Sequence, residues 1–182
     1  MSLPSRIYLM GVKHSGKSTL GELLAERLDR AFLDLDTTIM DLFARDSFGP
    51  PASVREIYEQ LGPAGFQELE AEAAAVIAHP ATLRTPDVVA LGGGTIDNEP
   101  AMERLADTGL FLYLLQDEAV LFRRIVRRGI PPFLRGDDPR AAFAELFRRR
   151  DTAYRQRADQ IADIQNLDPA ASVDLLVRIV QG

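Results

Sequence analysis

Short apolar runs alternate along the chain with longer segments in which apolar residues recur at helical spacing. The first run, Ile7–Met10, ends at Gly11, and the segment after it places Leu20, Leu24 and Leu28 on one face of a helix. A short continuous apolar run bounded by turn residues is typical of a strand that is buried on both faces. By this pattern we expect strands at residues 7–10, 31–35, 88–91, 110–115 and 160–164.

Helices are expected between the strands. Ser53 followed by Glu56 has the pattern of a capping box, and Gly62-Pro63 predicts a break in the helix that begins there. The expected helical segments are 17–30, 37–45, 53–62, 66–78, 117–128, 141–154 and 172–180, with a further helix beginning at Asp97 or Asn98. Strands that alternate with helices predict an α/β domain with a mainly parallel sheet, and we expect residues 1–182 to form one domain.

The composition excludes several classes of protein. Of the 182 residues, 46% are hydrophobic and 26% are charged, which is typical of a globular domain and not of a disordered or membrane protein. No apolar run approaches the roughly 18 residues of a spanning helix, and no signal-peptide segment precedes the first strand, so we expect a cytoplasmic protein with no membrane partner. The absence of cysteine excludes disulfides and Cys-ligated zinc, and two histidines are too few for a multi-His metal site.

The charge is unevenly distributed along the chain. A formal net charge of −6 disfavours nucleic acid as a partner, because binding a polyanion requires a positive field. Eleven of the nineteen arginines nevertheless lie between Arg123 and Arg157. Two interpretations of this segment stay open. It is either a solvated helix face or a lid that handles anions, since arginine binds phosphate and carboxylate in bidentate fashion.

One motif carries specific chemistry. Residues 11–18, Gly-Val-Lys-His-Ser-Gly-Lys-Ser, match G-x-x-x-x-G-K-[ST] at every fixed position, between a predicted strand and a predicted helix. The glycines allow backbone N–H groups to converge on a phosphate, and the helix dipole favours the same anion. Lys17 is expected to reach the β- and γ-phosphates, and Ser18 to ligate Mg²⁺. The loop residues expected to bind ATP are Gly11, His14, Ser15, Gly16, Lys17, Ser18 and Thr19.

This P-loop predicts nucleotide binding, which kinases share with GTPases and motor proteins. The sequence has no Asn-Lys-x-Asp motif for guanine, which disfavours a GTPase. The small size and the short distance to the next acidic motif favour a small phosphotransferase. Lys13 and His14 inside the loop either add positive charge to the phosphate site or are variable positions that face solvent.

Further motifs follow the P-loop in a recognisable order. They are Phe32-Leu33-Asp34-Leu35-Asp36, Gly62-x-x-x-Phe66, Gly92-Gly93-Gly94 and Arg150-x-x-x-Tyr154. With the P-loop they resemble the shikimate kinases over nearly the whole chain. The resemblance implies a three-layer α/β/α P-loop kinase fold with a five-stranded parallel sheet in the order 2-3-1-4-5. It also implies substrate-binding helices at about 37–80, a lid at about 129–139, ATP with Mg²⁺, and a monomer.

The resemblance assigns roles to two carboxylates. Asp34 would lie near Mg²⁺ with Ser18, and Asp36 would accept a hydrogen bond from the acceptor hydroxyl and serve as its base, with Lys17 as the other catalytic residue. The residues support this assignment, because both carboxylates leave the carboxyl end of a predicted strand beside the phosphate site. An alternative interpretation makes Asp36 the N-cap of the helix from Thr37.

The family pattern also implies a set of acceptor-binding residues. The glycine loop would bring backbone N–H groups to the acceptor ring, and Arg150 would bind its carboxylate. Arg124 resembles a basic position near adenine. Each of these residues has a simpler alternative as a core aromatic, a plain loop or a surface arginine. The acceptor set is Asp36, Tyr58, Phe66, Gln67, Gly92, Gly93, Gly94 and Arg150.

Two positions depart from the family pattern. Gln67 stands where the family has an arginine for the acceptor carboxylate, and Pro131 stands where the family has a lid arginine for the transferring phosphate. Nearby arginines would substitute in one interpretation, Arg55 for the carboxylate and Arg128 or Arg135 for the phosphate. In a second interpretation the acceptor is a different alcohol, and in a third the activity is lost. The presence of Lys17, Ser18, Asp34 and Asp36 disfavours the third.

The sequence therefore predicts an ATP-dependent small-molecule kinase. The resemblance implies transfer of the γ-phosphoryl group of ATP to the 3-hydroxyl of shikimate, a step toward chorismate and aromatic amino acids, with shikimate or a similar polyol acid as the small-molecule partner. Within the kinases the alternative acceptors are a sugar acid such as gluconate, another alcohol or a nucleoside monophosphate. Outside them the alternative is a non-catalytic switch in which ATP closes the lid toward a partner.

Overall fold

Five parallel strands form the sheet of this protein in the order β2-β3-β1-β4-β5. The computed structural model describes residues 4–46, 49, 53–79, 87–129, 134 and 136–182. Leu9 on β1 lies opposite Ala90 on β3 and Leu112 on β4, so all three strands end at the same edge. The strand order predicted from the family resemblance is confirmed. The strands are β1 (Arg6–Met10), β2 (Ala31–Asp34), β3 (Asp87–Ala90), β4 (Leu110–Leu115) and β5 (Gln160–Asp163).

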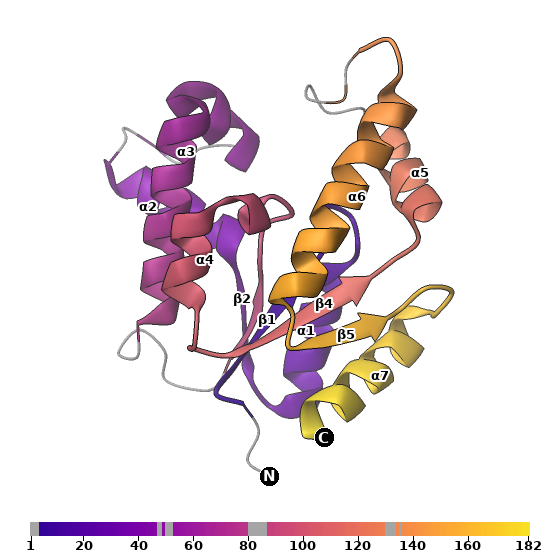
Figure 1. The fold of residues 1–182 in the computed structure, drawn as a ribbon. Helices are drawn as coiled ribbons and strands as arrows, with labels where there is room; N and C mark the ends of the chain where they lie inside the picture. The colour runs from indigo at the N-terminus through magenta and orange to yellow at the C-terminus, as the bar shows by residue number, and fades with distance from the viewer. Residues whose placement is uncertain (1–3, 47–48, 50–52, 80–86, 130–133, 135) are drawn as a thin grey trace.

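Helices cover both faces of the sheet and extend beyond its carboxyl edge. In Figure 1, α2, α3 and α4 stand together on one side of that edge, and α5 and α6 stand on the other. Helix α1 packs against α7 on one face of the sheet, and the other helices pack on the opposite face. The helices are α1 (Lys17–Leu28), α2 (Leu35–Asp46), α3 (Val54–Ala78), α4 (Glu99–Leu105), α5 (Glu118–Arg128), α6 (Pro139–Arg157) and α7 (Pro169–Gln181), with a short 3₁₀ helix at Thr95–Asp97.

The two faces of β1 belong to two different apolar cores. Ile7 and Leu9 pack with Leu24 of α1 and Leu176 of α7, whereas Tyr8 on the other face packs in the core that holds the remaining helices. Successive side chains of a strand point to opposite faces, so a strand buried on both faces is apolar throughout. This explains the continuous apolar run that predicted β1.

The boundary between β2 and α2 differs from the sequence expectation, whereas the predicted break within α3 is present. The strand predicted at residues 31–35 ends at Asp34, and Leu35 already belongs to α2. The break predicted at Gly62-Pro63 is confirmed: inside α3, Gly62 has a non-helical conformation, with φ of 69° and ψ of 178°. Proline lacks the N–H that a continuing helix would need, and glycine tolerates a positive φ, so two helical segments meet here at a kink.

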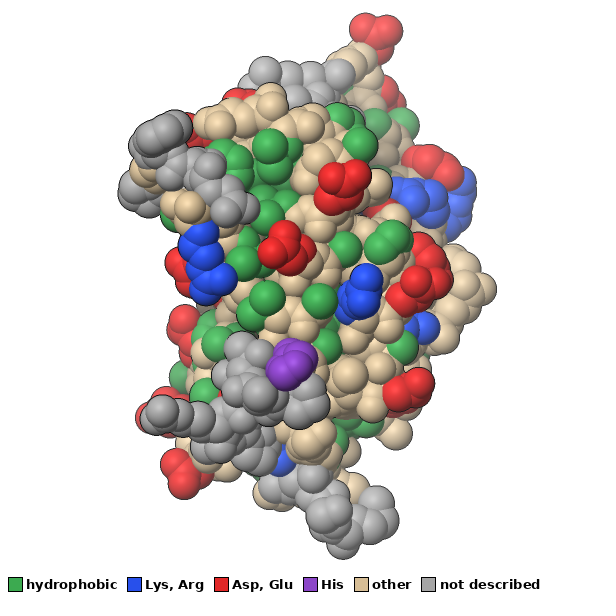
Figure 2. Space-filling model, turned by 90° about the vertical axis from the view of Figure 1, so that its left-hand side faces the viewer, with side chains coloured by type: hydrophobic (Ala, Val, Ile, Leu, Met, Phe, Trp, Pro, Cys, Tyr) green, Lys and Arg blue, Asp and Glu red, His purple; other side chains and the backbone are tan. Residues whose placement is uncertain are grey.

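In the view of Figure 2, acidic, basic and hydrophobic side chains are interspersed over the face that carries α2 and α3. Among the residues that the structure describes, no helix is both long enough and apolar enough to cross a membrane. Of the predicted lid, Pro131 and Arg135 lie outside the described residues, and so does the side chain of Arg128.

Candidate active site

The P-loop joins β1 to α1 and contains residues in left-handed conformations. Gly16, the N-cap of α1, has φ of 101°, and His14 has φ of 68°. A Cβ on Gly11 would lie 2.7 Å from the Ser15 Oγ and 3.2 Å from the Leu114 carbonyl oxygen, so there is no room for a side chain. The loop therefore turns tightly over the sheet edge, and the unpaired N–H groups at the start of α1 follow it directly.

Lys17 is the first residue of α1, and its side chain is buried beneath the loop. Its Nζ donates to the carbonyl oxygens of Gly11 at 2.7 Å and Val12 at 3.2 Å. Burial lowers the pKa of Lys17 to about 8, and the carboxylates of Asp36 and Asp34 oppose that shift. A poorly hydrated ammonium group gains more from an anionic partner than an exposed one does, so this site favours a phosphate oxygen.

Ser18 and Asp34 meet at the entrance to the loop. The Ser18 hydroxyl donates to Asp34 Oδ2 at 2.7 Å, and both residues line a depression of about 390 Å³ together with Glu22 and Asp41. Mg²⁺ binds oxygen ligands and usually takes one or two protein groups, with waters and phosphate oxygens completing its shell. A hydroxyl next to a carboxylate fits that donor set. In the described part of the chain, no group of three or more acidic or histidine side chains is arranged for a metal.

Asp36 lies in the first turn of α2, and its carboxylate faces the glycine loop. A Cβ on Gly92 would lie 3.4 Å from Asp36 Oδ1. Asp36 is solvent-accessible, yet desolvation by the surrounding protein raises the pKa of its carboxyl, and the charge of Asp34 raises it further. A carboxylate with a raised pKa is a stronger base, which suits a group that aligns an attacking hydroxyl.

The structure corrects the alternative role of Asp36 as the N-cap of a helix from Thr37. Helix α2 begins at Leu35, so Asp36 is inside it, and the capping contact belongs to Asp34. Asp34 Oδ1 accepts from the backbone N–H of Asp36 at 3.0 Å. Asp34 therefore holds the start of α2 with one oxygen and the Ser18 hydroxyl with the other, which leaves the Asp36 carboxylate out of the cap.

The glycine loop, residues 92–94, has close neighbours that leave little room for side chains. None of the three has a positive φ, but a Cβ on Gly93 would lie 2.8 Å from the backbone nitrogen of Lys13. A Cβ on Gly94 would lie 3.2 Å from Arg150 Nη2. The absence of side chains thus allows the P-loop, Asp36 and Arg150 to approach one loop from three sides.

Tyr154 fixes the glycine loop from α6. Its hydroxyl donates to the Gly93 carbonyl oxygen at 2.9 Å, and its ring stacks on Tyr113 with centroids 4.9 Å apart. Burial raises the pKa of Tyr154, so its hydroxyl keeps the proton that it donates. The spacing Arg150-x-x-x-Tyr154 therefore places both side chains on the face of α6 that meets this loop.

Glu70 is a buried carboxylate that the sequence analysis missed. It is 5% exposed, and its two oxygens accept from Thr95 Oγ1 and from Asn98 Nδ2, each at 2.7 Å. These bonds join α3 to the segment that follows the glycine loop. The available signal was its place on the apolar face of α3 with Ala73, Ala74 and Ile77, where an acid needs partners.

Arg150 is held by Asp97, which the sequence pattern indicated only as one of two candidate helix starts. Nε of Arg150 lies 2.9 Å and Nη2 lies 2.8 Å from Asp97 Oδ2. Arg149 donates to both oxygens of the same carboxylate, at 2.8 Å and 3.0 Å. The helix that was expected at Asp97 or Asn98 is capped by Asn98, whose side chain accepts from the Ala101 N–H. The arginine run 148–150 therefore includes two residues with a specific partner at the site.

The two aromatic residues of the predicted acceptor set, Tyr58 and Phe66, lie partly exposed on α3. The rings of Tyr58 and Phe66 meet edge to face with centroids 5.5 Å apart, and Tyr58 is 46% exposed. The Gln67 side chain is exposed on α3, and the backbone carbonyl oxygen of Gln67 accepts from Asn98 Nδ2 at 2.9 Å. Arg55, predicted as a substitute cation, pairs with Glu59 at 2.8 Å on the exposed surface of α3.

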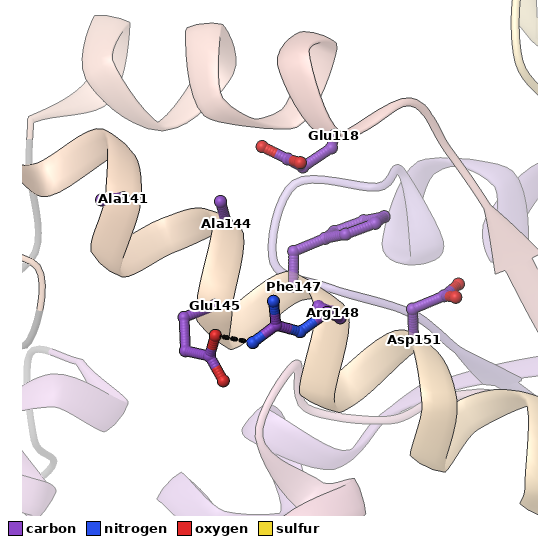
Figure 3. Close-up of a pocket in the computed structure, with 7 residues that line it drawn as sticks. All are labelled: Glu118, Ala141, Ala144, Glu145, Phe147, Arg148 and Asp151. Atoms are coloured by element: carbon purple, nitrogen blue, oxygen red, sulfur yellow. Dashed lines mark hydrogen bonds and ion pairs between the residues drawn. The ribbon is translucent and has the colours of Figure 1, made fainter.

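Arg124 contacts the P-loop. Its Nη1 donates to the His14 carbonyl oxygen at 2.9 Å, which brings α5 against the loop. A second depression, of about 500 Å³, lies between α5 and α6, and none of the predicted site residues lines it. In Figure 3 the Phe147 ring extends from α6 toward the start of α5, where Glu118 lies. We assign this second depression no part in the chemistry.

Comparison with known proteins agrees with this arrangement. Residues 13–181 match the family model described as shikimate kinase. The chain is 35% identical over 172 residues to a shikimate kinase of Dechloromonas aromatica, an alignment that covers 94% of this chain and 88% of that protein. It is 37% identical over 138 residues to a shikimate kinase of Chloroherpeton thalassium, covering 76% and 68% of the two chains.

Solved structures show the same likeness. A shikimate kinase from Acinetobacter baumannii in complex with shikimate superposes with a TM-score of 0.80 and 32% identity, over 99% of this chain and 92% of that one. The shikimate kinase from Bacteroides thetaiotaomicron gives a TM-score of 0.79 at 28% identity, over 97% and 98% of the two chains. With a family model that covers almost all of its length, and with the fold and sheet order described above, the chain belongs to the shikimate kinase family.

Proposed function

We propose that this protein is a kinase that transfers the γ-phosphoryl group of ATP to the 3-hydroxyl of shikimate. One observation carries the proposal beyond family membership. Asp36 lies between the two halves of the site, with Lys17 and Asp34 on the phosphate side and Gly92 and Glu70 on the other. An acceptor hydroxyl beside Asp36 would face a phosphate held by the P-loop, which is the geometry that phosphoryl transfer needs.

The proposed reaction uses the groups of this chain for positioning and proton transfer. The backbone of the P-loop and Lys17 hold the phosphates, so that the γ-phosphorus faces the acceptor oxygen. The acceptor oxygen attacks in line, its proton passes to the Asp36 carboxylate, and the bond to the β–γ bridging oxygen breaks to give ADP. The raised pKa of Asp36 favours uptake of that proton. Ser18 and Asp34 would hold Mg²⁺, which neutralises charge on the phosphates when bound.

Several finer assignments belong to the same proposal. We infer one P-loop kinase domain in which helices within residues 37–80 hold the acceptor, and Arg150 binds its carboxylate. Closure of residues 129–139 as a lid would exclude water and so prevent ATP hydrolysis. A cytoplasmic monomer that acts in aromatic amino acid biosynthesis, without a nucleic acid or membrane partner, is the setting that we infer.

A changed acceptor is the second candidate, and Gln67 favours it. An exposed neutral amide at this position binds a carboxylate less strongly than a guanidinium does, since charge-assisted hydrogen bonds are roughly twice as strong as neutral ones. An alcohol with a smaller or neutral group facing Gln67 is therefore an alternative acceptor. A non-catalytic switch would have no need of an acceptor-side base, and Asp36 disfavours it.

ADP release from ATP and Mg²⁺ tests the proposal. Shikimate should give strong turnover, and a panel of gluconate, quinate and nucleoside monophosphates should give little. Turnover with another member of the panel and none with shikimate would replace the proposed acceptor. Absence of ADP release with every acceptor, together with ATP binding in a calorimetric titration, would favour the non-catalytic switch.

A further inference from the structure

Asp97 connects the glycine loop to α6 through two arginines. It ends the 3₁₀ turn that directly follows Gly94, and both of its oxygens accept from side chains of α6. Arg149 spans the two oxygens, and Arg150 contacts Oδ2 alone through Nε and Nη2. A carboxylate in this place sets the distance between the loop and the helix, and it also fixes the plane of each guanidinium group.

The contact with Asp97 orients the guanidinium group of Arg150, because it holds one edge of that group. A guanidinium carries five N–H donors, and the edge formed by Nε and Nη2 is used on Asp97. The guanidinium lies against Gly94, where a Cβ would be 3.2 Å from Nη2. Its side chain is 16% exposed, compared with 57% for Arg149. Arg150 is thus the inner, oriented cation, and Arg149 is the outer one.

The charges of this cluster explain why two arginines are present. Arg149 and Arg150 carry two positive charges against the single negative charge of Asp97, so one positive charge remains. Without Arg149, Arg150 and Asp97 would neutralise each other beside the place where an acceptor carboxylate is expected. Gln67 contributes no charge that would restore the balance. The pair Asp97–Arg149 therefore orients Arg150 and leaves its charge available to an anion.

We infer that Asp97 is a positioning residue for acceptor binding. It orients Arg150 toward the acceptor carboxylate, and Arg149 neutralises the negative charge of Asp97. This inference rests on the proposed function, in which Arg150 binds that carboxylate. Arg149 thereby keeps the charge of Arg150 available at the site, whereas Arg55 is paired with Glu59 on the exposed surface of α3.

The first experiment compares kinetic constants of the Asp97→Ala variant with those of the wild type. The KM for shikimate should rise about tenfold, the size expected when a hydrogen-bonded charge loses its orientation, while the KM for ATP changes by less than about twofold. Asp97→Glu should recover part of the loss. An unchanged or lower KM for shikimate would overturn the inference, because Asp97 would then be irrelevant to the acceptor or compete with it.

A matched acceptor separates positioning from a merely structural role. Shikimate methyl ester lacks the negative charge of the group that Arg150 would bind and is larger by one methyl group. In the wild type the acid should have the lower KM, and in Asp97→Ala the two values should approach each other. Loss of folding stability alone would leave their ratio unchanged, and that result would contradict the inference even if overall activity fell.

The role of Arg149 is tested by a double-mutant cycle. Arg149→Gln should raise the KM for shikimate severalfold in the wild-type background and have little effect in Asp97→Ala, because Arg149 acts through Asp97. Arg155→Gln is the control. Arg155 lies on the same helix, but its Nε pairs with Asp151 Oδ2 at 2.8 Å and not with Asp97. Equal effects of Arg149→Gln and Arg155→Gln would show a general charge effect and overturn the assignment.

The wild-type panel distinguishes failure of this inference from failure of the proposed function. Turnover of shikimate with no change in Asp97→Ala would contradict the inference alone. Turnover of gluconate or quinate in place of shikimate would contradict the proposed function, and the same variants would then be measured with that acid and its ester. Absence of turnover with every carboxylate acceptor would overturn both.

Discussion

The phosphate half of the site and the acceptor half are built from contacts of very different range. In the phosphate half, the Lys17 ammonium group bonds to carbonyls five and six residues away, and Ser18 bonds to Asp34, sixteen residues away. In the acceptor half, Thr95 bonds to Glu70 across 25 residues and Arg150 to Asp97 across 53. A local motif thus forms the first half, whereas packing between distant helices forms the second.

Because of this difference, we expect the two halves to control different kinetic constants. The phosphate half consists largely of backbone groups and one lysine, so it leaves little room for variation in chemistry. The acceptor half includes side chains on α3, α6 and the 3₁₀ turn after Gly94, which can change without contact with the P-loop. The glycine loop itself cannot, because a Cβ on Gly93 would lie 2.8 Å from the backbone nitrogen of Lys13. Variants of the first half should therefore lower kcat or the affinity for ATP, and variants of the second should change the KM for the acceptor.

The largest effect is expected for Lys17→Ala. The variant loses the buried ammonium group at the phosphates, and kcat should fall by about 10³-fold or more. Lys13→Ala is the matched control, because Lys13 lies on the same loop but is exposed. Steady-state ADP release measures both. A comparable loss in Lys13→Ala would show that the overall charge of the loop matters more than the buried position.

Asp36→Asn is expected to have the next largest effect. The amide retains the shape of the side chain but cannot take the acceptor proton, so kcat should fall by about 10²- to 10³-fold with little change in the KM for ATP. Single-turnover measurements with saturating ATP would report the chemical step directly. Turnover close to that of the wild type would remove Asp36 from the mechanism.

The phosphate half could be predicted from the sequence because its spacing alone specifies its geometry. Gly11, Gly16, Lys17 and Ser18 were identified from one motif, and the structure places them around one loop. The strand order required the resemblance to a family, since alternating strands and helices predict a parallel sheet but do not determine the order of its strands. The role of Asp34 as the cap of α2 depended on one hydrogen bond at a strand end, which no pattern specifies.

The acceptor half was predicted by residue type but not by contact. The sequence did not reveal the roles of Glu70, Asp97 and Arg149, because each acts through a partner on a different element. The spacing of residues along the chain does not show such pairs. That the three glycines bring backbone N–H groups to the acceptor ring stays a prediction, and the neighbours that the structure gives them include the P-loop backbone at Lys13 and the Arg150 guanidinium. Arg55 was proposed as a substitute cation from proximity in sequence, and its contact is with Glu59 on its own helix.

Glu70→Ala tests the stability of the acceptor half. The substitution leaves the buried donors of Thr95 and Asn98 without their acceptor, which should cost about 2–3 kcal/mol of unfolding free energy and lower the Tm by about 5–10 °C. Glu59→Ala on the same helix removes an exposed ion pair and should change the unfolding free energy by less than about 0.5 kcal/mol. Thermal denaturation of both variants makes the comparison. Equal changes would mean that burial of Glu70 contributes nothing specific.

The pKa of Lys17 predicts how ATP affinity depends on pH. Burial lowers that pKa to about 8, so the free protein loses the positive charge as the pH rises through that value. A bound phosphate favours the charged form, and affinity for a non-hydrolysable ATP analogue should therefore fall above about pH 8, by at most about tenfold per unit. Calorimetric titrations from pH 7 to pH 10 measure this. Lys17→Arg should abolish the inflection, because arginine stays charged throughout. An inflection that persists in Lys17→Arg would assign it to another group.

The smallest expected effect is a gain in Gln67→Arg. A guanidinium on the exposed surface of α3 would add a charge-assisted bond to the acceptor carboxylate, and the KM for shikimate should fall by about three- to tenfold. The KM values for ATP and for shikimate methyl ester should stay unchanged, since neither substrate offers a carboxylate at that place. Gln60→Arg adds the same charge elsewhere on α3 and should give no gain. If both variants lowered the KM equally, the acceptor half would respond to its overall field. If neither did, Gln67 would not face the carboxylate, and the separation of the two halves would rest on Asp97 and Arg150 alone.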